Sequence, residues 1–246
     1  MPAQQNAQTQ TKTFVLVHGA WHGGWCWARV AERLRALGHR VFTPTQTGLG
    51  ERKHLLGATI TLDTFVQDIA NVLLWEDLNN VILVGHSFAG LSITGVADIL
   101  PQRILHLVYL DAFILDSGIS TFDTLPKETV EKLREAAEER GQGLALPAPK
   151  PKAFGLFEPA DIAFIAARLT PQPLRTYETA LHLNNAIGNG LPCTYLHSIA
   201  PLFAPVEATW QWVEKQPYWT RIEINAGHDS MVSHPDLVAR HLLNVA

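Results

Sequence analysis

The sequence predicts a doubly wound α/β domain with a mostly parallel sheet of six strands and an inserted helical cap. Short runs rich in Val, Ile and Leu recur along the chain, and helix-length segments separate them. Runs that are apolar nearly throughout are typical of strands covered on both faces of a parallel sheet. Strands that alternate with helices favour a doubly wound order, and one long interval breaks this alternation.

Six segments have the composition of buried strands. They are residues 13–18, 39–44, 80–87, 104–112, 192–198 and 220–228. Five segments between or after them have helical spacing of apolar residues, namely 25–38, 61–78, 87–100, 205–215 and 234–245. The first helix ends at Gly38, which is a usual residue beyond a helix C-terminus. Each of the last two has Pro near its first turn.

The long interval lies between the fourth and fifth strands. It contains helix candidates at 126–140, 158–169 and 172–183 and a Pro-rich stretch at 146–154. We expect a cap over the carboxyl ends of the strands, where open α/β sheets bind their ligands. A decorative insertion is the alternative. The expected organisation is a flexible tail (1–12), a core (13–112 and 191–246) and the cap (113–190).

Composition excludes several classes of function. The chain has 246 residues, 47% of them hydrophobic, and its 19 Lys and Arg against 23 Asp and Glu give a net charge of -4. Without a basic stripe, nucleic acid is not an expected partner. The polar start and the absence of a long apolar run predict a soluble, cytoplasmic protein without membrane contact. A homodimer is left open.

The two cysteines are predicted to be small buried hydrophobes. Cys26 and Cys193 each lie in or beside an apolar segment, and no ligand cluster with zinc spacing accompanies them. Such cysteines more often pack in a core than form a disulfide or a metal site. We therefore expect neither a metal nor a cofactor.

A serine occupies the turn between the third strand and the following helix. The stretch reads Gly85-His86-Ser87-Phe88-Ala89-Gly90. Small neighbours allow the strained turn that holds a nucleophilic hydroxyl above a sheet, in the Gly-x-Ser-x-Gly pattern. Here Ala89 replaces the second glycine. The alternative is that Ser87 only caps the helix, but the order of serine, acid and histidine along the chain favours a nucleophile.

His228 is the predicted general base. It follows the last strand after a turn at Gly227, at the sheet edge that also carries Ser87. Two other histidines, His18 and His86, flank the site but are fixed beside glycines. The following are expected at the surface or at helix ends: His39, His106, His182, His197, His234 and His241.

Five motifs together resemble the α/β-hydrolase superfamily, in the branch that contains plant methyl-ester esterases and hydroxynitrile lyases. They are VLVHGAWHGGWCW (15–27), TPTQTGLGER (43–52), VGHSFAG (84–90), YLDAF (109–113) and AGHDSM (226–231). The resemblance implies that the backbone N–H groups of Ala20 and Phe88 form an oxyanion hole. Two such fixed dipoles can each lower a barrier by about 3 to 4 kcal/mol.

The acid departs from the family pattern. Most relatives carry Asp after the next-to-last strand, but residues 195–207 contain no aspartate. Asp111 ends the strand next to the one that leads into Ser87, which is a known alternative place in the superfamily. We therefore predict Asp111 as the partner of His228. Glu207, or no acid at all, is the alternative, and Asp229 is set aside because neighbouring side chains on one turn rarely face each other.

The resemblance also narrows the reaction. Hydroxynitrile lyases of this branch have Thr and Lys where this chain has Gly19 and Asp229, so cyanohydrin cleavage is disfavoured. His18, Gly19 and Trp21 are predicted to border the substrate pocket, with Trp21 and Phe88 as apolar walls.

Outside this pocket, Trp27 is expected in the core. Residues 47–52 form a candidate second site loop, in which Glu51 and Arg52 could equally be a surface ion pair.

The predicted function is that of a serine hydrolase that cleaves a small, apolar carboxylic ester through an acyl-enzyme, without a cofactor. The expected partner is therefore a small-molecule ester. Two alternatives keep the fold. One is a cofactor-free oxygenase or lyase that uses the histidine and the acid as a base, and the other is a non-catalytic small-molecule receptor.

Overall fold

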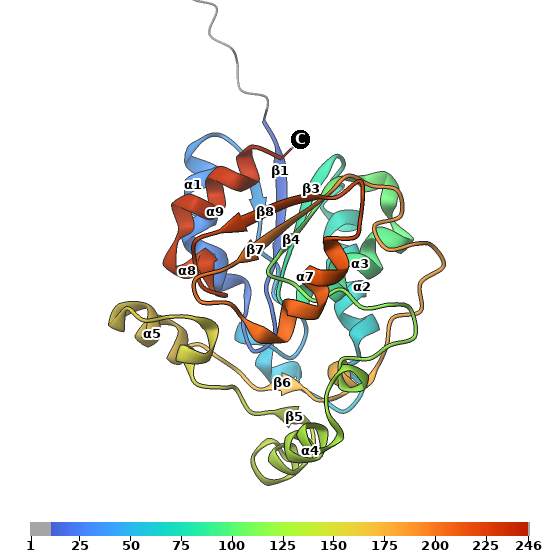
Figure 1. Cartoon of the computed structure of the whole chain (residues 1–246), viewed down its shortest axis with the longest axis vertical. Helices are drawn as coiled ribbons and strands as arrows, with labels where there is room; N and C mark the ends of the chain where they lie inside the picture. The colour runs from blue at the N-terminus through green and yellow to red at the C-terminus, as the bar shows by residue number, and fades with distance from the viewer. Residues whose placement is uncertain (1–10, 246) are drawn as a thin grey trace, which may run out of the picture.

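A computed structural model describes residues 11–245, and its centre is the predicted six-stranded sheet (Figure 1). The strand order is β2-β1-β3-β4-β7-β8, and every pair in it is parallel. The strands are Thr13–Val17 (β1), Arg40–Phe42 (β2), Val81–His86 (β3), Ile104–Leu110 (β4), Cys193–Ser198 (β7) and Thr220–Ile224 (β8). The predicted fold class is confirmed.

Helices cover both faces of the sheet. They are Ala28–Ala36 (α1), Leu62–Trp75 (α2), Ala89–Ile99 (α3), Glu207–Val213 (α7), Ser230–Ser233 (α8) and Pro235–Leu243 (α9). In Figure 1, α1, α8 and α9 lie on one side of the sheet and α2, α3 and α7 on the other. Within β1, Phe14 and Leu16 pack on the first side and Val15 and Val17 on the second. This two-residue alternation explains why β1 is apolar at consecutive positions from Phe14 to Val17.

Local signals set several helix ends. Gly38 follows α1 with φ +84°, a conformation that glycine adopts without strain. Thr61 and Thr64 form a capping box at the start of α2, and Pro235 opens α9. Short 3-10 helices cover Gly24–Trp27 (η1), Gly50–Leu55 (η2), Pro101–Arg103 (η3), Phe122–Thr124 (η4), Pro151–Phe154 (η5) and Ala204–Val206 (η6).

The inserted segment, residues 113–190, lies beyond the end of the sheet toward which β1 runs (Figure 1). It contains Lys127–Gly141 (α4), Pro159–Ala166 (α5), Arg175–Glu178 (α6) and an antiparallel pair, Ala145–Leu146 (β5) and Gln172–Pro173 (β6). The helix predicted over 172–183 is wrong. Gln172 is extended because its side chain accepts from the N–H of Trp21 and donates to Thr176, and the helix shrinks to α6.

The first ten residues of the expected tail lie outside the described residues. Lys12, its last residue, donates from Nζ to the backbone carbonyls of Leu243 and Val245. Both cysteines are buried and free, as predicted. No helix within residues 11–245 has the length and apolarity needed to cross a membrane.

Candidate active site

Ser87 occupies a sharp turn between β3 and α3. Its φ of +53° is unusual for a residue with a side chain, and its N–H donates to the carbonyl of Leu110 on the neighbouring strand. Gly90, rather than residue 89, is the position that must be glycine, because a Cβ there would lie 2.2 Å from the carbonyl oxygen of Phe113. Ala89 is therefore compatible with the turn.

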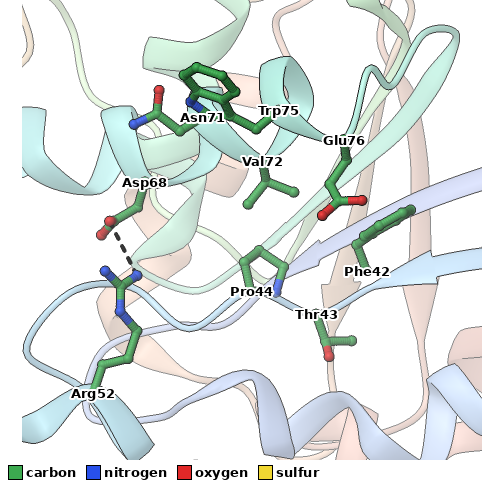
Figure 2. Close-up of a pocket in the computed structure, with 9 residues that line it drawn as sticks. All are labelled: Phe42, Thr43, Pro44, Arg52, Asp68, Asn71, Val72, Trp75 and Glu76. Atoms are coloured by element: carbon green, nitrogen blue, oxygen red, sulfur yellow. Dashed lines mark hydrogen bonds and ion pairs between the residues drawn. The ribbon is translucent and has the colours of Figure 1, made fainter.

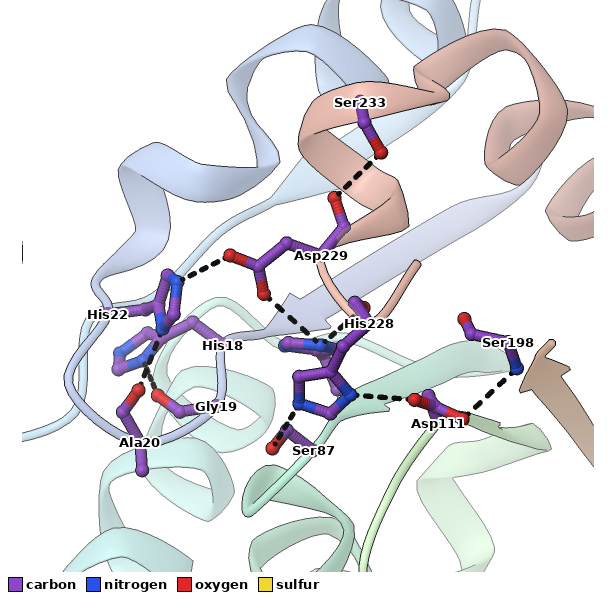
Figure 3. A network of polar contacts seen from close by, with 11 residues as sticks. His18, Gly19, Ala20, His22, Ser87, Asp111, Ser198, His228, Asp229 and Ser233 are labelled. Carbon is purple, nitrogen blue, oxygen red and sulfur yellow. Dashed lines mark hydrogen bonds and ion pairs between the residues drawn. The ribbon is translucent and has the colours of Figure 1, made fainter. Parts of the chain in front are cut away.

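His228 brings its ring to Ser87 from the turn after β8. Nε2 of His228 lies 2.9 Å from Oγ of Ser87, and Nδ1 lies 2.7 Å from Oδ2 of Asp111 (Figure 3). A carboxylate only accepts, so Nδ1 carries the proton that bonds Asp111. In the neutral ring Nε2 is then free to accept from the Ser87 hydroxyl. The three side chains form one continuous line of hydrogen bonds.

Asp111 is fully buried at the end of β4, the strand that pairs with β3. Burial alone would raise the pKa of this carboxyl. Hydrogen bonds from His197, His228 and the N–H of Ser198 outweigh burial and lower the pKa of Asp111 to about 2. Asp111 is therefore a carboxylate at neutral pH.

Glu207, the alternative acid, contacts a different histidine. Its Oε1 lies 3.3 Å from Nε2 of His197, whose Nδ1 lies 3.3 Å from Oδ1 of Asp111. The expectation that His197 lies at the surface is wrong, because it is buried on β7 and stacks on Trp210 with ring centroids 4.5 Å apart. Its place at the carboxyl end of a strand, next to the Asp111 strand, is the signal that could have identified it.

The loop after β1 lies against Ser87. A Cβ on Gly19 would approach Cβ of Ser87 to 2.7 Å, so this position requires glycine. Within residues 11–245, no protein group accepts a hydrogen bond from the backbone N–H of Ala20 or of Phe88. Phe88 directly follows Ser87 in the chain. Ala20 directly follows Gly19, which lies against Ser87.

Ser87 is only 7% exposed, and aromatic rings pack against its chain neighbour Phe88 and against His228. Phe88 stacks on Tyr177 of the inserted segment with ring centroids 4.9 Å apart. Trp21 lies 6.1 Å from the rings of both Tyr177 and Phe154 and donates from Nε1 to the carbonyl of Leu146. The ring of Phe203 stacks on His228 at 3.7 Å. The inserted segment therefore forms part of the wall around the site.

His18, one of the predicted pocket residues, is fully buried below the loop. Nδ1 donates to the carbonyl of Gly19, and Nε2 accepts from the N–H of Gln46. Burial lowers the pKa of His18 to about 3, so the ring is neutral. Its contacts shape the loop that carries Gly19 and Ala20, and its ring is enclosed by protein.

Among residues 11–245, one group of side chains has ligand atoms close enough for a metal: those of His86, His228 and Asp229 lie within 4.8 Å of one another. Both ring nitrogens of His228 already contact Ser87 and Asp111. A metal bound to His228 would break one of those bonds.

A hollow with a volume of about 480 Å³ is lined by residues other than Ser87, Asp111 and His228 (Figure 2). Its lining residues are Phe42, Thr43, Pro44, Arg52, Asp68, Asn71, Val72, Trp75 and Glu76, none of which contacts Ser87. Arg52 forms an ion pair with Asp68 at 3.3 Å, and not with Glu51 as the sequence suggested.

The fold and the site define an α/β hydrolase. The chain belongs to the alpha/beta hydrolase family, whose model matches residues 14–241. It is 39% identical over 239 residues to the carbendazim hydrolyzing esterase of Nocardioides sp. (strain SG-4G), which covers 93% of this chain and 97% of that protein. It is 29% identical over 258 residues to methylesterase 4 of Arabidopsis thaliana, with 96% of each chain covered.

A similar solved structure is an extracellular alpha/beta-hydrolase from a Paenibacillus species. The TM-score is 0.80 at 26% identity, and the match covers 93% of this chain and 96% of that one. An alpha-hydroxynitrile lyase of Arabidopsis thaliana matches over 105 residues at 39% identity. The predicted branch of the superfamily is therefore confirmed.

Proposed function

We propose that this protein is a serine hydrolase that cleaves a small, apolar carboxylic ester through an acyl-enzyme. One observation carries the proposal: His228 lies 2.9 Å from the Ser87 hydroxyl on one side and 2.7 Å from the Asp111 carboxylate on the other. That is the arrangement in which an imidazole can take a proton from serine. Relatives named as esterases support the same reaction class.

In the first half of the reaction, Oγ of Ser87 attacks the ester carbonyl carbon while Nε2 of His228 takes the hydroxyl proton. The carbonyl oxygen becomes an oxyanion near the N–H groups of Ala20 and Phe88. The bond to the leaving oxygen then breaks, and His228 returns the proton to the departing alcohol. The acyl group remains on Ser87.

In the second half, water replaces the alcohol. His228 takes a proton from water as the water oxygen attacks the acyl carbon. The bond between this carbon and Oγ of Ser87 then breaks, and His228 gives the proton to Oγ. The products are the free acid and the original enzyme. Asp111 keeps Nδ1 of His228 protonated throughout and stabilises the imidazolium, for which its low pKa suits it.

The surroundings of Ser87 favour an apolar substrate. Phe88, Tyr177, Trp21 and Phe154 form a connected cluster of aromatic rings next to Ser87 and His228. Rings at such a site bury an apolar ligand and exclude water. Two probe classes follow from the relatives: methyl esters, and carbendazim, which one relative is named for hydrolysing.

The test is turnover of methyl and nitrophenyl esters with acyl groups of graded size, and of carbendazim, by wild type and Ser87→Ala. Ser117→Ala is the matched control, since it removes an exposed hydroxyl from the inserted segment. We expect Ser87→Ala to abolish ester turnover and the control to retain it. Turnover that Ser87→Ala only weakens would indicate base catalysis without an acyl-enzyme. Binding without any turnover by wild type would indicate a receptor.

A further inference from the structure

A further histidine–carboxylate pair lies behind the proposed catalytic residues. Nε2 of His22 and Oδ2 of Asp229 are 3.1 Å apart, and both side chains are buried, with exposed fractions of 1% and 0%. His22 comes from the loop after β1, and Asp229 directly follows His228 (Figure 3). Nothing in the proposed reaction uses either side chain.

The hydrogen bonds of His22 fix its protonation. Nδ1 lies 2.7 Å from the backbone carbonyl oxygen of Ala20, and Nε2 faces the Asp229 carboxylate. Carbonyl and carboxylate oxygens only accept, so both ring nitrogens must donate. A ring with a proton on each nitrogen is an imidazolium, and His22 and Asp229 are therefore a buried ion pair.

Three other buried titratable groups near this pair are neutral. Burial lowers the pKa of His18 and of His86 to about 3, so both rings are neutral at ordinary pH. Burial also raises the pKa of the Cys26 thiol, which is neutral too.

Within the pair, the two charges oppose the effect of burial. Burial favours the neutral form of each group, but Asp229 raises the pKa of His22 and His22 lowers the pKa of Asp229. The remaining titratable neighbour is His228 itself.

The pair joins two loops that meet at Ser87. One end holds the carbonyl of Ala20, next to the N–H assigned to the oxyanion. The other end is the residue after His228, whose own carbonyl accepts from Nε2 of His86 at 3.0 Å. Oδ1 of Asp229 lies 3.7 Å from that same nitrogen of His86. The carboxylate of Asp229 therefore connects the backbone of the His228 turn, through the ring of His22, to the carbonyl of Ala20.

We propose that His22 and Asp229 are positioning residues: their ion pair holds the oxyanion loop against the His228 turn, so that the N–H of Ala20 and the ring of His228 converge on Ser87. The catalytic consequence rests on the proposed esterase function. The ion pair itself and the coupling of the two loops do not depend on it.

The first experiment is ring nitrogen NMR of the ¹⁵N-histidine-labelled full-length protein at neutral pH, with His22 assigned by its absence in His22→Gln. We expect the ring of His22 to carry a proton on each nitrogen. A neutral His22 ring would overturn the proposal. The protonation state is measured on wild type, and the variant is needed only to assign the signal.

The second experiment compares Asp229→Asn with Asp236→Asn. The control removes a carboxylate of the same kind from an exposed pair with Arg33, near the same end of the chain. We expect Asp229→Asn to lower kcat by about tenfold or more with KM within about threefold, as loosened positioning does. The plot of kcat against pH should also change shape in Asp229→Asn. In Asp236→Asn it should keep the wild-type shape.

Hydrogen–deuterium exchange separates failure of this inference from failure of the esterase proposal. Asp229→Asn should speed exchange in residues 18–22 and 226–230, and Asp236→Asn should not. Faster exchange without any ester turnover by wild type would contradict the esterase and leave the coupling of the loops intact. Unchanged exchange together with wild-type kcat in Asp229→Asn would overturn the positioning role.

Discussion

The carboxylate of Asp111, the residue directly after β4, accepts a hydrogen bond from Nδ1 of His228 at 2.7 Å, whereas the resemblance to the family implies an acid after β7. The adjacent strands β3 and β4 therefore carry the serine and the acid side by side. Residues that surround this bond lead to separate predictions.

Asp111→Asn should lower kcat by about 10³-fold or more with little change in KM, because an amide can hold the wrong tautomer of His228 and cannot stabilise its charged form. Steady-state kinetics on the best ester of the panel measures this. The variant must first show a wild-type circular dichroism spectrum, since the site is buried. An Asp111→Asn enzyme with near-normal kcat would remove Asp111 from the mechanism.

Glu207→Gln should lower kcat by less than about tenfold. Glu207 contacts His197 and not His228, so its effect reaches the proposed base only through Asp111. His197→Gln should have the larger effect of the two, because it removes a direct donor to the Asp111 carboxylate. A collapse of kcat in Glu207→Gln that exceeds the loss in Asp111→Asn would transfer the role of the acid to Glu207.

Gly19→Ala should reduce kcat by about 10²-fold, since the added methyl would meet Cβ of Ser87 at 2.7 Å and push the loop with Ala20 away. Gly57→Ala is the matched control, because its new Cβ would have only one neighbour, at 3.9 Å. Kinetics and thermal unfolding of both variants test this. Equal activity of the two variants would show that the close approach of the loop is unimportant.

The free energy of unfolding should fall as pH drops from 6.5 toward 3, because the pKa values of His18 and His86 are about 3 in the folded chain and about 6.5 in the unfolded chain. In this pH range the two rings bind protons in the unfolded chain but not in the folded chain, so acid favours unfolding. Below pH 3.8 the lowered pKa values of Asp111 and Asp229 add to the loss.

Urea unfolding across this range tests the acid prediction. His86→Gln can still donate to the carbonyl of His228 but cannot take up a proton, so the fall between pH 6.5 and 3 should be shallower than in wild type. The control is His234→Gln, at an exposed position, and its profile should follow wild type. A wild-type profile that is flat over this range would contradict the assignment of neutral buried rings.

Much of the fold follows from local pattern. Both faces of the sheet are covered, so the central strands β1, β3 and β4 are largely apolar and visible in the sequence. Gly38 marks a helix end because glycine adopts its positive φ without strain. The helix prediction for residues 172–183 was wrong because the apolar spacing of this segment is helical, whereas the side chain of Gln172 accepts a hydrogen bond from Trp21, 151 residues away. Contacts of that range override local preference.

The site was predictable to the extent that strand ends define it. Ser87, Asp111 and His228 each follow a strand, and parallel strands end at one edge. The pairs His197–Glu207 and His22–Asp229 could not be predicted from the sequence, because no local pattern shows where a side chain points. His22 and Asp229 are 207 positions apart and meet only through the packing of two loops.

The central claim is that His228 activates Ser87 to form an acyl-enzyme. The most direct measurement is rapid-quench mass spectrometry of the protein mixed with a good ester from the panel. The account predicts an acyl adduct on the peptide that contains Ser87 in wild type, and its loss in His228→Asn. Ester turnover without any adduct on Ser87, or an adduct that forms equally fast in His228→Asn, would contradict it.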